Sequence, residues 1–112
     1  MAQHDFSSDP ATLDQQVKQA FAAALAQIPE VQELYSQHIR DEDDPADDEV
    51  RIYVVMEEMH IFAHGKVAEM ENEIIDALPE DLKYRYEFLR LFRKDGQVEQ
   101  IVAQAGFERF YP

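Results

Sequence analysis

The stretch that decides the fold is Asp41-Glu42-Asp43-Asp44-Pro45-Ala46-Asp47-Asp48-Glu49, which runs directly into Val50-Arg51-Ile52-Tyr53-Val54-Val55-Met56. Seven of the nine residues in the first part carry carboxylates, and burial would cost each ion its hydration. The second part is rich in β-branched and aromatic residues, which are typical of strands. We therefore expect an exposed acidic loop over residues 41–49, followed by an interior strand over residues 50–56.

The composition indicates one domain with its own core. The chain has 112 residues, of which 46% are apolar, and it has no cysteine. This length and apolar content suffice for a core without disulfides or metals, and thiolate sites are excluded. No apolar run approaches the roughly 20 residues that span a bilayer, and the N-terminus lacks the features of a signal peptide. We expect a cytoplasmic protein with a flexible tail over residues 1–9 and a single domain over residues 10–112.

The charge is strongly negative and unevenly distributed. The net charge is -14, and residues 1–79 hold 18 acidic but 4 basic side chains, whereas residues 80–112 hold 6 of each. Phosphates would be repelled, so neither direct DNA binding nor binding to an anionic membrane is expected. A basic protein partner is compatible with this charge, as are plain solubility and a homodimer. The basic cluster of the C-terminal third is interpreted as an exposed strand face that pairs with the acidic loop of the same chain or of a second copy; it comprises Lys83, Arg85, Arg90, Arg93 and Lys94.

Apolar residues recur at helical spacing in the first third of the chain. Asp9-Pro10 is a helix-start signal, and the spacing predicts an amphipathic helix over residues 10–28. Its buried face would comprise Leu13, Val17, Phe21, Ala24, Leu25 and Ile28. Similar spacing favours a second helix at about residues 30–39, with a short strand over residues 31–36 as the alternative; the residues concerned are Val31, Leu34, Tyr35, His38 and Ile39.

The second half alternates between helical and extended patterns. A helix should begin between Met59 and Lys66 and end at Pro79, with Ala63, Val67, Met70, Ile74 and Leu78 buried. The acidic residues of this helix should lie largely outside the buried face; they are Glu69, Glu71, Glu73 and Asp76. Alternation of Tyr84, Tyr86 and Phe88 with charged residues favours a strand within residues 82–92, although helical spacing also fits. A turn at Lys94-Asp95-Gly96, a short helix from Val98 capped by Gly106, and a terminal strand or docked tail follow. The fold class is α+β: a small three- to four-stranded sheet with helices packed on it.

His60 and His64 form the one candidate metal site. They lie four residues apart, so on a helix they would share a face, as paired metal ligands do. The alternative is a pair of partly exposed histidines at a helix entrance. Gly65-Lys66 lacks the remaining residues of a phosphate loop, and the acidic loop lacks the spacing and the glycine of an EF-hand. No catalytic residue and no cofactor are predicted.

Three further passages belong together: Leu34-Tyr35-Ser36-Gln37-His38-Ile39-Arg40, Asp48-Glu49-Val50-Arg51-Ile52-Tyr53-Val54-Val55, and Gln104-Ala105-Gly106-Phe107-Glu108-Arg109-Phe110-Tyr111. Their order resembles the minimal nucleotidyltransferase fold of small bacterial proteins, which are often paired with a helical partner. The resemblance implies a Mg²⁺ site at Asp47, Asp48 and Glu49. However, Ser36-Gln37 replaces the family's Gly-Ser, and Arg51 replaces its second strand carboxylate, so a non-catalytic member is implied.

The sequence favours a non-catalytic acidic module that binds a basic protein, for example in an antitoxin-like or immunity-like role. The acidic surface around residues 41–49 and 69–76 would contact the partner. The loop carboxylates of this surface are Asp41, Glu42, Asp43, Asp44, Asp47, Asp48 and Glu49. The two alternatives are a divergent Mg²⁺-dependent nucleotidyltransferase and a metal-binding protein that uses the two histidines.

Overall fold

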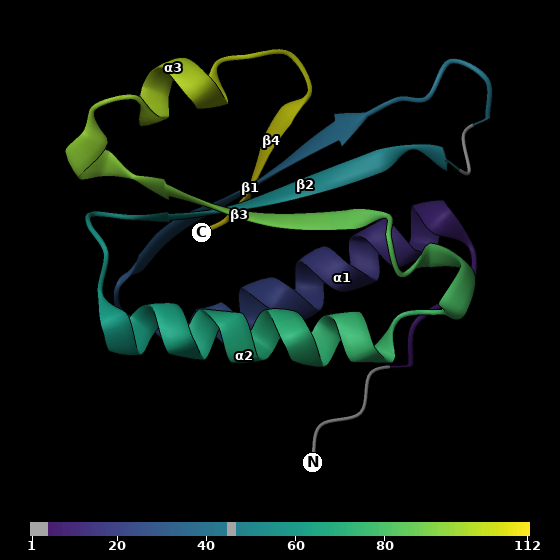
Figure 1. The fold of residues 1–112 in the computed structure, drawn as a ribbon, viewed down its shortest axis with the longest axis horizontal. Coiled ribbons are helices and arrows are strands. Elements are labelled where there is room, and N and C mark those ends of the chain that lie inside the picture. Colours follow the sequence, from purple (N-terminus) through teal and green to yellow (C-terminus); the bar gives the residue numbers. More distant parts are fainter. Residues whose placement is uncertain (1–4, 45–46) are drawn as a thin grey trace.

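Four strands form one mixed sheet in the computed structural model, which describes residues 5–44 and 47–112 (Figure 1). The elements follow the order α1 (Pro10–Leu25), β1 (Val31–Ile39), β2 (Glu49–Met56), α2 (Ile61–Ala77), η2 (Glu80–Leu82), β3 (Tyr86–Phe92), η3 (Arg93–Asp95), α3 (Val98–Val102) and β4 (Phe107–Tyr111). The α+β class is therefore confirmed.

The strand order in the sheet is β3-β2-β1-β4. β1 is antiparallel to both β2 and β4, whereas β2 and β3 are parallel and are joined through α2. Figure 1 shows α1 and α2 on one side of the sheet and the short α3 on the other. β2 occupies an interior position, as its two partly apolar faces predicted. No helix among the described residues has the length and apolarity needed to cross a membrane.

The N-terminal helix begins where the sequence predicted. The Asp9 side chain accepts a hydrogen bond from the Thr12 backbone N–H at 3.1 Å, which satisfies a helix-terminal donor. The helix ends at Leu25, one turn earlier than expected, although Ile28 is still buried. Residues 5–9 of the expected flexible tail are attached to the domain, because Phe6 packs against the core and the Ser7 N–H donates to Gln16 Oε1 at 2.7 Å. Residues 1–4 lie outside the described part.

The helix favoured at residues 30–39 is wrong, and the alternative of a strand is confirmed, although the strand is longer than the expected residues 31–36. The segment is strand β1, paired with β2 on one side and β4 on the other. The pairing with β2 shifts register between Val31 and Glu33. A bulge of this kind displaces the strict alternation of a strand by one residue. As a result Val31 and Leu34 both join the helix-side core although they are three residues apart. The bulge therefore gives the buried residues of a strand the spacing that is expected of a helix.

The C-terminal half follows the predicted order, with differences in orientation. The strand at residues 82–92 is confirmed but begins at Tyr86, so residues 83–85 precede it and do not alternate with it. Tyr84 is consequently exposed and Arg85 is buried, which is the reverse of the expected faces. The short helix ends at Val102 and is capped by Ala103, not by the predicted cap Gly106. Gly106 has φ +89° and leads into β4.

Candidate functional site

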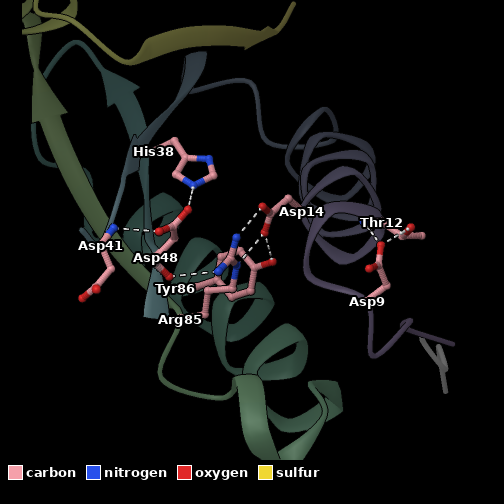
Figure 2. Close-up of polar contacts among 8 residues, drawn as sticks. All are labelled: Asp9, Thr12, Asp14, His38, Asp41, Asp48, Arg85 and Tyr86. Atoms are coloured by element: carbon pink, nitrogen blue, oxygen red, sulfur yellow. Dashed lines mark hydrogen bonds and ion pairs between the residues drawn. The ribbon is translucent and has the colours of Figure 1, made fainter. Parts of the chain in front are cut away.

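One carboxylate closes the acidic loop at its base. Asp48 is buried; its Oδ2 lies 2.7 Å from His38 Nε2, and its Oδ1 accepts the Asp41 backbone N–H at 2.7 Å (Figure 2). These bonds connect the end of β1 with the start of β2. The hydrogen bonds from Asp41 and then from His38 lower the pKa of Asp48 below its ordinary value, because each stabilises the ionised carboxylate.

A buried arginine is hydrogen-bonded to the base of the loop. Arg85 Nη1 donates to the Asp48 backbone oxygen at 2.9 Å, while its Nε and Nη2 donate to the two oxygens of Asp14 in α1 at 3.0 and 2.9 Å (Figure 2). The Tyr86 hydroxyl also donates to Asp14. The bonds to Asp14 raise the pKa of Arg85, and burial raises the pKa of Tyr86. One guanidinium thus joins α1, the start of β3 and the acidic loop.

The loop has local structure of its own above this base. Asp41 Oδ1 accepts the backbone N–H groups of Asp43 at 2.8 Å and of Asp44 at 3.1 Å, and the Asp47 N–H donates to the Asp44 carbonyl at 2.9 Å. Residues 45 and 46 lie outside the described part. The other carboxylates that were expected to bind a partner are exposed; they are Asp41, Glu42, Asp43, Asp44, Asp47 and Glu49. Asp48 differs from them, because its carboxylate is used to hold the loop.

An exposed aromatic residue directly precedes the arginine that contacts the base of the loop. Tyr84 is 95% exposed, and it immediately precedes Arg85, whose carbonyl accepts the Val50 N–H at 2.9 Å. The alternation of residues 83–88 had placed Tyr84 on an apolar face, so sequence reasoning missed this exposure. The signal that could have found it is Pro79 followed by two acidic residues, which favours a turn before the strand.

The basic side chains of the C-terminal third form their ion pairs with acids outside the loop, while Arg85 also donates to the Asp48 backbone oxygen at the base of the loop. Their ion pairs reach α1, α2, β1 and nearby turns, so the expected pairing with the acidic loop of the same chain is wrong for the described residues. Pairing with the loop of a second copy stays a prediction. The buried pair between Glu71 and Arg90 was also missed, since Glu71 was expected outside the helix's buried face. The pairs are Lys83–Glu80, Arg85–Asp14, Arg90–Glu71, Arg93–Glu33, Arg93–Glu99, Lys94–Glu58 and Arg109–Glu33.

The histidine pair sits at the start of α2. His60 is the N-cap, with its Nδ1 accepting the Ala63 N–H at 3.2 Å, so one ring nitrogen already serves the helix. His64 lies one turn further and is half-buried. Within residues 5–44 and 47–112, no group of three or more histidine or carboxylate side chains could hold a metal ion. A metal on this pair would need its other ligands from elsewhere.

Comparisons with protein-family models, with curated proteins and with solved structures found no match to this chain. The interpretation of the site therefore rests on its geometry. The nucleotidyltransferase resemblance implies a Mg²⁺ site at Asp47, Asp48 and Glu49. Asp47 and Glu49 are exposed, but the Asp48 carboxylate is hydrogen-bonded to other groups of the chain. Arg51 Nε lies 3.5 Å from Glu87 Oε2, which places its cation on the sheet beside the adjoining strand.

Proposed function

We propose that this chain is a non-catalytic protein-interaction module that binds a basic partner through the acidic loop, residues 41–49, and the adjacent Tyr84. The observation that carries the proposal is the buried base of the loop. Asp48 closes it, and the Arg85–Asp14 pair ties it to the domain. A loop held in this way loses less conformational entropy on binding than an unanchored one.

Electrostatics favour a basic partner. The exposed carboxylates of the loop lie close together in sequence, and the cations of the C-terminal third are paired with other acids of the chain. The field of the loop is therefore not neutralised by these cations. Such a field speeds association with a positively charged surface and repels acidic competitors. An antitoxin-like or immunity-like role is one specific form of this function.

Tyr84 supplies a contact of a different kind. Tyrosine is enriched among the residues that dominate binding energies, since its ring offers a large apolar area at low entropic cost. A lysine or arginine that crosses the carboxylates could also stack on the ring face through a cation–π contact. The exposed ring next to a negative loop therefore fits a cationic segment better than a purely apolar one.

The proposal is tested by titrating an isotope-labelled chain with an arginine- and lysine-rich peptide and following the amide resonances. Shifts should concentrate at residues 41–49 and 84–85 and weaken with added salt. The loop variant, Glu42→Gln with Asp43→Asn and Asp47→Asn, should lose them.

A control variant removes an equal number of carboxylates around Lys94. Glu57→Gln, Glu58→Gln and Asp95→Asn change side chains that all act on this lysine. The control should bind the peptide as the wild type does. Shifts spread over all acidic surfaces, or equal losses in both variants, would contradict the proposal. Stabilisation by Mg²⁺ with a nucleoside triphosphate, lost in Asp48→Asn, would instead favour a nucleotidyltransferase.

A further inference from the structure

A groove with a volume of about 680 Å³ runs between α1 and α2. The two helices lie side by side on the same face of the sheet (Figure 1). The floor and walls are largely apolar, and the charged groups belong to α2. The lining residues are Ala20, Ala23 and Ala24 of α1, Gln27 and Ile28 just after it, and Lys66, Glu69, Met70, Glu73 and Ile74 of α2.

Exposed apolar side chains extend the α2 wall of the groove. Phe62 is 78% exposed and stands one turn before Lys66, on the same face of the helix. Its neighbours Ile61 and Met59 are 80% and 55% exposed. The fold thus leaves three large apolar side chains in solvent within four consecutive residues. Contiguous exposed apolar groups of this kind mark interaction surfaces more often than single ones do.

The dimensions and the backbone of the groove suit a helix. From Phe62 to Ile74 the α2 wall spans about 18 Å, or roughly three helical turns. The small side chains of Ala20, Ala23 and Ala24 allow another backbone to approach closely. Both walls are helices whose backbone groups are paired internally, so an extended peptide would find no strand edge to join. A helix with an apolar stripe fits such a groove through side-chain packing alone.

The charge of the rim selects the class of partner. Glu69 and Glu73 line the groove together with one cation, Lys66, so the rim carries an excess of negative charge, as does the whole chain at -14. A second copy would bring these carboxylates against their own equivalents, which is unfavourable. We propose that the groove between α1 and α2, with Phe62 at its end, docks a basic amphipathic helix of another protein. This surface shares no residue with the acidic loop, so an experiment can refute either proposal without refuting the other.

The test uses an end-blocked synthetic peptide with leucines at helical i, i+3, i+4 and i+7 spacing and lysines at the other positions. A peptide of the same composition without the stripe, and one with glutamates in place of the lysines, serve as controls. Affinities come from fluorescence anisotropy, and amide shifts locate the contact. Only the striped basic peptide should bind tightly, with shifts at residues 20–28 and 62–74.

Two variants probe the groove and one controls for the loop. Phe62→Ala should weaken binding about tenfold or more, as for an exposed aromatic anchor. Ala23→Gln, an exposed position, should weaken it similarly by filling the groove. Tyr84→Ala, at the other exposed aromatic, should leave the affinity unchanged. Circular dichroism would verify that each variant is folded.

Three outcomes would overturn the inference. If Tyr84→Ala abolishes binding while Phe62→Ala does not, the peptide binds at the loop, so the loop function survives and the groove site fails. If sedimentation shows a dimer that Phe62→Ala converts to a monomer, the groove is covered by a second copy. Equal binding of the striped and unstriped peptides would also refute helix docking.

Discussion

Arg85 and Asp14 form a two-pronged ion pair across 71 positions of sequence, with N–O distances of 3.0 and 2.9 Å. Their side chains are 4% and 13% exposed. The third bond of the guanidinium holds the Asp48 carbonyl at the base of the acidic loop. The packing of α1 on the sheet and the position of the loop therefore depend on the same buried cation.

Removing Asp14 should destabilise the fold strongly. In Asp14→Ala the Arg85 guanidinium stays buried without its carboxylate, which typically costs about 3–5 kcal/mol. Urea unfolding measures the change. The exposed pair Lys94–Glu58, at 3.0 Å and with side chains 72% and 59% exposed, is the control, and Glu58→Gln should cost less than about 1 kcal/mol. Similar small effects in both variants would show that the Arg85 pair does not anchor the fold.

The closure of the loop should make stability sensitive to acid. The pKa of Asp48 is lower in the folded chain than its ordinary value of 3.8, so the unfolded state binds more protons just below that pH. Its contribution is therefore present above pH 3.8 and is lost as the pH falls through the folded pKa. Asp48→Asn should flatten this part of the stability profile, measured by denaturant unfolding at several pH values. A profile as steep as that of the wild type would contradict the role given to Asp48.

Two glycines should respond to alanine in opposite ways. Gly106 has φ +89°, and an added Cβ would lie 3.3 Å from the His38 carbonyl oxygen, so Gly106→Ala should cost about 1–3 kcal/mol. Gly65 lies within α2 with nothing within 4 Å of an added Cβ. Gly65→Ala should stabilise the chain by about 0.5–1 kcal/mol. Thermal or urea unfolding tests both, and a destabilised Gly65→Ala variant would contradict the packing described for α2.

The order of elements could be predicted from local patterns, except where tertiary pairing overrode them. Helical periodicity located α1 and α2, and the β-branched run located β2. At β1 the bulge after Val31 broke the alternation that would have identified a strand. Strand pairing on both sides then outweighed the helical spacing, as the context dependence of strand preference allows.

The buried ionic contacts could not be predicted from the sequence. Arg85 and Asp14 lie far apart in the chain, and Glu71 and Arg90 meet only because α2 crosses back over the sheet. The acidic loop itself was correctly expected to be exposed, since most of its carboxylates are. Asp48 is the exception, because His38 and the Asp41 N–H satisfy it within the chain. Such compensation depends on three-dimensional proximity, which residue type alone does not reveal.

The most direct test of the loop as a partner-binding surface is affinity capture from the native host. The baits are the wild-type chain, the loop variant at Glu42, Asp43 and Asp47, and the control variant at Glu57, Glu58 and Asp95, with recovered proteins quantified by mass spectrometry. We predict that the wild type and the control recover the same basic protein and that the loop variant recovers little of it. Equal recovery by the loop variant, or no specific protein with any bait at low and moderate salt, would contradict the proposed function.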